Sequence, residues 1–267
     1  MAHLANAFHF VSLRPQNCLI SNPLDALLAI FQREVAAFFN TLVAYLVIGV
    51  FLVGVGLFFW IFPNNLLDTG AATMEPLFVI GPWFMLFLIP AITMRSFADE
   101  FRSGTWEWLV TRPVHSWQIL IGKYFAAAFL VKLSVLPTLL FFFSVYYLAQ
   151  PVGGVDTGAI IGAYIGMIFV GTVFAAVGLF ASTLTDNQII AFVLGVFLCF
   201  FLYAAFDLLA ELAIFGSIND SILLLGLQEH YRSISRGVVD TRDIIYFFSV
   251  IVLFLSFSQL SLALRRT

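Results

Sequence analysis

Six long apolar stretches constrain this chain more than any other feature of its sequence. A bilayer core about 30 Å thick is spanned by roughly 20 helical residues, and six runs near that length carry at most one charge each. They are Thr41–Phe62, Pro76–Met94, Tyr124–Ala149, Thr157–Ser182, Gln188–Leu209 and Ile244–Leu264. Lipid offers the backbone no hydrogen-bond partners, so each run must satisfy its own polar groups. We therefore predict an all-α membrane protein with six transmembrane helices.

The composition indicates which kinds of molecule the chain is expected to bind. Hydrophobic residues make up 62% of the chain and charged residues 10%, against about 45–50% and about 25% in soluble domains. The net charge of −3 is too small to indicate nucleic-acid binding. We expect membrane lipid as a partner and no nucleic acid. The 267 residues leave no room for a large soluble domain beside six spans.

Basic residues indicate the orientation of the spans. They precede the first run, lie between the second and third, and end the chain, as Arg14, Arg33, Arg95, Arg102, Arg112, Lys123, Arg265 and Arg266. An even number of spans puts these segments on one side, which the positive-inside rule makes cytoplasmic. Residues 63–75, 150–156 and 210–243 then face the opposite side. Both termini are predicted to be cytoplasmic, and the amino-terminal residues lack the pattern of a cleaved signal peptide.

An amphipathic segment precedes the first span. From Leu24 to Phe39 the apolar residues follow helical spacing, while Asp25, Gln32 and Arg33 fall largely on the other face. Arg33 and Glu34 would be costly deep in the membrane. We predict a separate helix lying in the membrane interface. A plain extension of the first span is the alternative.

Residues 95–123 form the only sizeable polar island between two apolar runs. Gly104 favours a helix stop, and Thr105 favours the start of a new short helix with Glu107 in its first turn. Pro113 ends that helix, because proline lacks an amide donor and restricts the residue before it. We predict a rigid bracket of two helices on the cytoplasmic side. Its charges either dock a partner protein or are simply solvated.

The bracket carries a family signature. Residues 99–113 and 119–124 resemble the cytoplasmic signature of type-two ABC transporter permeases: an acidic residue, arginine, Gly-Thr, Glu, a short apolar stretch, Thr-Arg-Pro and then Gly-Lys. Phe31–Glu34 resembles the connector helix of that family, and Thr185–Gln188 also fits its pattern. The resemblance implies a permease domain at 24–267 after a variable amino-terminal extension at 1–23.

The resemblance also implies that transport and ATP hydrolysis are carried out by separate chains. The chain is expected to be the permease subunit of a probable exporter in the bacterial inner membrane and not itself an enzyme. A separate cytoplasmic ABC ATPase dimer would bind ATP and Mg and supply the energy, and a second permease, identical or different, would complete the transporter. The amphipathic segment becomes a connector helix, and the bracket becomes a coupling helix between spans two and three.

Eight residues are assigned to ATPase coupling by this resemblance: Arg33, Glu34, Glu100, Arg102, Gly104, Thr105, Glu107 and Arg112. Within the family, His230–Asp243 resembles the last external loop of the gliding-motility-associated permease of Bacteroidetes. The alternative function is a structural membrane anchor of a motility or secretion complex that moves no substrate.

No catalytic, cofactor-binding or metal-binding residue is predicted. Gly122 and Lys123 come nearest to a phosphate loop, but Trp117 and Tyr124 occupy the positions of its first glycine and its hydroxyl residue. The spans hold no paired histidines, acid dyad or serine with a plausible base. Asp207 and Glu211, one turn apart near the outer end of the fifth span, are either a cation site or interfacial carboxylates.

Overall fold

The computed structural model describes residues 23–63, 72–110, 115–150, 152–211, 223–238 and 240–265. These residues form helices and no strand, and six helical stretches are long and apolar enough to cross a membrane. The spans are α3 (Val43–Trp60); α5 (Glu75–Thr93) with α6 (Arg95–Arg102); α8 (Ser116–Val135) with η2 (Leu136–Thr138) and α9 (Leu139–Leu148); α10 (Thr157–Leu184); α11 (Gln188–Phe200) with η3 (Phe201–Ala205) and α12 (Phe206–Glu211); and α15 (Thr241–Leu264). The prediction of six spans is confirmed.

Three further helices, outside the spans, complete the described fold. They are α2 (Pro23–Asn40), α7 (Thr105–Val110) and α14 (Leu227–Ser235). The third span begins at Ser116, earlier than the predicted Tyr124, because the helix continues past the apolar run into the polar island. The predicted 1–23 extension lies outside the described residues except for Pro23, as do residues 111–114 and 212–222.

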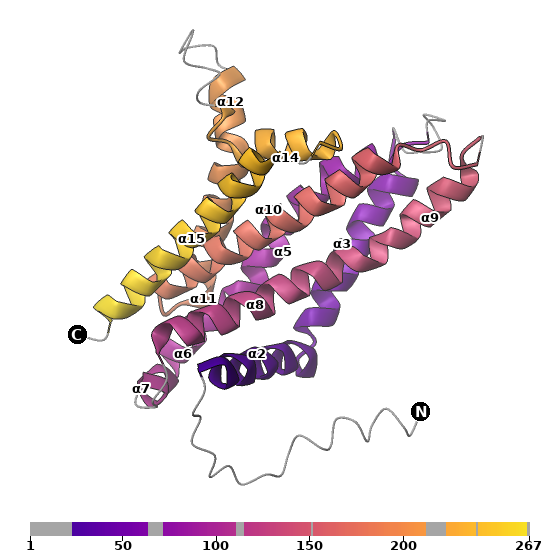
Figure 1. The fold of residues 1–267 in the computed structure, drawn as a ribbon. Helices are drawn as coiled ribbons and strands as arrows, with labels where there is room; N and C mark the ends of the chain where they lie inside the picture. Colours follow the sequence, from indigo (N-terminus) through magenta and orange to yellow (C-terminus); the bar gives the residue numbers. More distant parts are fainter. Residues whose placement is uncertain are drawn as a thin grey trace, which may run out of the picture.

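The span α10 forms the centre of the bundle. Buried residues make up 78% of its most apolar window, against 28% for α3 and for α15. Glycines such as Gly171 and Gly178 let neighbouring side chains approach its backbone closely. It packs against α5, α8, α11, α14 and α15, and Figure 1 shows it running between them.

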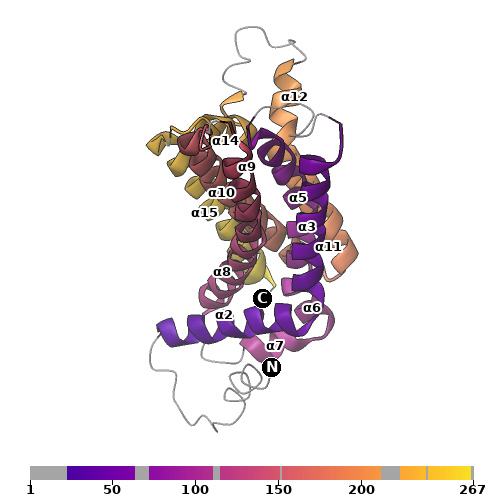
Figure 2. The same ribbon diagram turned by 90° about the vertical axis from the view of Figure 1, so that its right-hand side faces the viewer.

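The two ends of the bundle carry different elements. At one end lie α2, α6, α7, the start of α8 and the carboxyl-terminal end of α15, while α12, α14 and the start of α10 lie at the other (Figures 1 and 2). Figure 2 shows α2 lying across the end of the bundle. A break at Thr41 and Leu42 separates the two helices. The structure therefore has a separate α2 and no continuous extension of α3; its position in a membrane interface stays a prediction.

Candidate functional site

Four charged side chains from three helices meet where α2 crosses the bundle. Arg33 and Glu34 lie on α2, Glu100 lies on α6, and Lys123 lies near the start of α8. We call this set the charged junction. Glu34 and Lys123 are 89 positions apart in the chain, so only the folded structure brings the set together.

Lys123 is the centre of the charged junction. Its side chain is 2% exposed. The ammonium donates to Oε1 of Glu100 at 2.8 Å, to Oε1 of Glu34 at 3.1 Å and to the carbonyl of Ser96 at 2.7 Å, which uses all three of its hydrogens. The ring of Phe97 lies 5.1 Å from the nitrogen. A buried ammonium is costly unless it is paired in this way, so Lys123 holds α2 and α6 against α8.

Arg33 closes the charged junction on its exposed side. Its guanidinium lies 2.8 Å from Glu34 and 3.3 Å from Glu100. Burial alone would raise the pKa of Glu34, but the charges and hydrogen bonds of Lys123 and Arg33 outweigh burial and hold this pKa below its usual value. Two cations thus balance two carboxylates. Oε2 of Glu100 is buried and has no hydrogen-bond partner within the described part of the chain.

Gly122 explains why α2 comes close enough to reach Lys123. A Cβ at Gly122 would lie 2.8 Å from Cγ2 of Ile30 and 3.4 Å from the carbonyl oxygen of Leu27. A larger residue would therefore push α2 away from α8. The Gly-Lys pair of the sequence signature thus has a geometric basis, because the glycine admits α2 and the lysine binds it.

A helix break joins the charged junction to the interior of the bundle. The span bends from α5 into α6 at Met94, and backbone groups at a helix end need partners from elsewhere. The buried hydroxyl of Ser182, on α10, accepts from the N–H groups of Phe97 and Ala98 at 3.0 and 3.1 Å. The same hydroxyl donates to the carbonyl of Met94 at 3.0 Å. Ser182 therefore fastens the start of α6 to α10.

Two further contacts hold α6 at this end of the bundle. The carboxylate of Asp99 accepts a hydrogen bond from the amide of Gln188, at the start of α11. The guanidinium of Arg265, just after α15, lies 4.2 Å from the ring centroid of Phe101 and pairs with Asp186. Together with Ser182 and the charged junction, these contacts connect α6 to α2, α8, α10, α11 and the end of α15.

A tight turn separates α6 from α7. Gly104 has φ of +69°, a left-handed conformation that glycine adopts at little cost and that commonly ends a helix. The hydroxyl of Thr105 lies 2.9 Å from that of Ser103 and 3.4 Å from the carbonyl of Glu100. The turn is thus fixed by backbone geometry at one residue and by a short hydroxyl network around it.

The outward end of the bracket combines a buried tryptophan with exposed charges. Trp106 is buried, with its ring 5.9 Å from Phe97 and 5.6 Å from Phe101, both edge to face. Glu107 and Arg102 are exposed, and neither forms an ion pair with any described residue. The aromatic contacts fix α7 on α6, while both charges stay available to another molecule.

The residues predicted for coupling fall into distinct groups. Arg33, Glu34 and Glu100 pair inside the charged junction. Gly104 and Thr105 shape the turn, Arg102 and Glu107 are exposed, and Arg112 lies outside the described residues. The side chain of Glu100 is 15% exposed and pairs with two cations, and its contact with a partner stays a prediction.

Lys123 and Ser182 are absent from the predicted set, although both hold the bracket in place. For Lys123 a signal was present, because the Gly-Lys pair belongs to the signature. For Ser182 the sequence offers no signal, since a serine within an apolar span has many uses. No group of three metal-binding side chains occurs in the described ranges.

Comparison with known proteins places the chain in a family. Residues 64–264, about three-quarters of the chain, match the model of the family described as "ABC-2 family transporter protein". The matched range includes α6, α7 and α8, with Glu100 and Lys123 of the charged junction, and stops short of α2. No curated protein matches the chain.

Proposed function

Because this chain belongs to the ABC-2 transporter family and is a membrane-spanning permease subunit, we propose that α6 and α7 couple it to a separate cytoplasmic ABC ATPase. The observation that supports the proposal is the contrast between the exposed charges of the bracket and the many contacts that hold α6 in place. Arg102 and Glu107 are exposed, whereas α6 behind them is fastened to five other elements. Movement of a partner bound at α7 would therefore displace the spans.

The same end of the bundle is proposed to face the cytoplasm of a bacterial inner membrane. Arg33, Arg95, Arg102, Lys123 and Arg265 all belong to elements at this end, as the positive-inside rule requires of the cytoplasmic side. Both termini would then be cytoplasmic.

The proposed transporter contains two permeases and an ATPase dimer. Each permease presents one α7, and a dimeric ATPase offers two equivalent surfaces, so two α7 helices would satisfy both. ATP and Mg would be bound by the ATPase chains. The proposed direction is export, and the resemblance of His230–Asp243 to a loop of the gliding-motility permease supports a role in gliding motility. Deleting the gene should then abolish colony spreading, and a strain that spreads normally would remove this role.

The coupling is tested by reversing the two exposed charges of the bracket. The chain is purified in mild detergent with the ATPase that accompanies it and reconstituted in proteoliposomes. Arg102→Glu with Glu107→Lys should weaken ATPase retention about tenfold or more, since each lost charge contact contributes roughly 1 kcal/mol. The control, Asp25→Lys, changes an exposed charge on α2.

Three outcomes are informative. Loss of retention and of stimulated ATP hydrolysis in the double variant alone supports coupling through α7. Equal retention by the double variant and the wild type contradicts it. If an ATPase that cannot hydrolyse ATP still supports full function in cells, the chain acts as a structural anchor and not as a transporter.

A further inference from the structure

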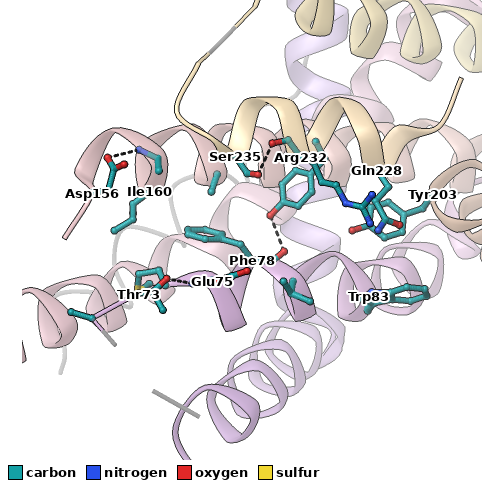
Figure 3. Close-up of a pocket in the computed structure, with 16 residues that line it drawn as sticks. Thr73, Glu75, Phe78, Trp83, Asp156, Ile160, Tyr203, Gln228, Arg232 and Ser235 are labelled. Carbon is teal, nitrogen blue, oxygen red and sulfur yellow. Dashed lines mark hydrogen bonds between the residues drawn. The ribbon is translucent and has the colours of Figure 1, made fainter. Parts of the chain in front are cut away.

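A cavity of about 580 Å³ opens at the end of the bundle opposite the charged junction. Its walls come from the start of α5, the start of α10, η3 and α14 (Figure 3). The volume falls within the range of small-molecule sites, about 300–1,000 Å³. We call it the outer cavity. None of the predicted coupling residues lines it.

Four aromatic side chains contribute to the walls of the outer cavity. Phe78 and Trp83 come from α5, Tyr203 from η3 and Tyr231 from α14. The rings of Trp83 and Tyr203 stand edge to face at 5.6 Å. The hydroxyl of Tyr231 donates to the carbonyl of Phe78 at 2.8 Å, which fastens α14 to α5 and is drawn in Figure 3. Ring faces attract cations through their quadrupoles, so these walls favour a positively charged ligand.

The charged residues that line the cavity also favour a cation. Arg232 is the positively charged residue of the lining, but its guanidinium lies 3.1 Å from Oδ2 of Asp207, whose negative charge neutralises it. Glu75 and Asp156 also line the cavity, and neither forms an ion pair with another described residue. The lining therefore has an excess of negative charge.

Asp207, which together with Glu211 forms either a cation site or a pair of interfacial carboxylates, is buried and pairs with Arg232. Both alternatives stay predictions. The side chain of Glu211 lies outside the described part of the structure. The carboxylates that remain for a cation are those of Glu75 and Asp156.

The backbone departs from regular geometry at this cavity. The fifth span changes from α-helix to π-helix over Phe201–Ala205 and returns to α-helix at Phe206. π-Helical turns are rare, and they occur frequently at functional sites. Tyr203 enters the cavity from this turn, and Asp207 follows it by four residues, on the same face of the helix. The irregular turn thus places both the aromatic wall and the carboxylate that restrains Arg232.

We propose that the outer cavity binds an organic cation with an apolar body, held by the aromatic rings and by the carboxylates of Glu75 and Asp156. The inference deepens the proposed transport function and rests on it only in regarding the ligand as cargo. Binding itself requires neither the ATPase nor a second permease.

Two ions of nearly identical shape and opposite charge test the proposal. Tetraphenylphosphonium is the cation and tetraphenylborate the anion. Binding of each to the full chain is measured by equilibrium dialysis in a non-ionic detergent, with empty micelles subtracted. The proposal expects saturable binding of tetraphenylphosphonium and at least about fivefold weaker binding of tetraphenylborate.

Variants then separate charge from ring contacts. Glu75→Gln should weaken tetraphenylphosphonium binding by up to about fivefold. Trp83→Leu should weaken it about two- to fivefold, whereas Trp83→Phe keeps a ring and should retain most of it. Asp25→Asn removes the same charge at the opposite end of the bundle and should change nothing.

Each remaining outcome contradicts the proposal. Equal binding of the two ions shows that shape and hydrophobicity suffice, and tighter binding of tetraphenylborate makes this a site for anions. No saturable binding of tetraphenylphosphonium, or binding insensitive to Glu75→Gln and Trp83→Leu alike, removes the site. Since no ATPase is present, these results are independent of the coupling test at α7.

Discussion

The two ends of this bundle use charged residues in opposite ways. In the charged junction every charge is paired, and Lys123, with a 2% exposed side chain, leaves no donor unused. At the outer cavity Arg232 pairs with Asp207, whereas the lining carboxylates of Glu75 and Asp156 form no ion pair with another described residue, although that of Asp156 accepts from the N–H of Ala159. Paired charges fix helices relative to one another, whereas carboxylates beside a cavity can receive a ligand. The difference agrees with the two proposals, coupling at the end that holds the charged junction and ligand binding at the outer cavity.

Substituting Lys123 tests the role of the charged junction, and we expect it to have the largest effect of the variants below. Lys123→Met leaves Glu34 and Glu100 largely buried without their main cation, which typically costs about 3–5 kcal/mol. We expect a clearly lower unfolding temperature in detergent and loss of ATPase stimulation. Lys123→Arg retains the charge and should lose less.

A double variant shows whether charge is the cause. Adding Glu100→Gln to Lys123→Met removes one of the stranded carboxylates, so part of the lost stability should return. If the two substitutions simply add, the charged junction is not acting as a unit.

Ser182 tests whether the inner end is fastened to the interior. Ser182→Ala removes the partner of two backbone N–H groups and one carbonyl at a buried helix break, for a cost of about 1–3 kcal/mol. We expect lower thermal stability and weaker ATPase stimulation. Ser256→Ala is the control, because its hydroxyl donates only to Val252 in the same helix. Equal effects of the two changes would show that α6 does not depend on Ser182.

Gly162 tests the outer half of the comparison. A Cβ at Gly162 would lie 2.4 Å from the carbonyl oxygen of Ile234, so Gly162→Ala must push α14 away from α10 at a typical cost of about 1–3 kcal/mol. The wall that carries Tyr231 should shift, and tetraphenylphosphonium binding should weaken. At Gly49 a Cβ meets nothing within 4 Å, and Gly49→Ala should leave binding unchanged.

Acid pH gives the smallest expected effect. The folded-state pKa of Glu34 lies below its ordinary value of 4.5, so its pairing stabilises the folded chain above about pH 4.5 and is lost as the pH falls through the lower, folded-state pKa. Thermal unfolding of the wild type should therefore approach that of Glu34→Gln as the pH is lowered from 7 towards 3. A gap between the two that stays constant would mean that Glu34 contributes no charge pairing.

The sequence predicts the spans well because each requires only a local run of apolar residues. The turn at Gly104 is likewise local. The charged junction is harder, because the pair of Glu34 with Lys123 depends on how α2 lies on α8, and that in turn depends on the missing side chain of Gly122. The outer cavity could not be predicted, since its walls come from four elements and its Tyr203 is oriented by a π-helical turn with no sequence signature.

The uninterrupted course of α10 has a mechanical consequence. Gly162 touches the helix that walls the outer cavity, and Ser182 binds the helix that leads to α7. At 1.5 Å per residue the two positions are about 30 Å apart, with neither a loop nor a proline between them. An uninterrupted helix of this length can carry a tilt from one end to the other. Under the two proposals, ligand binding at the outer cavity and movement of the ATPase at α7 would act on this same helix.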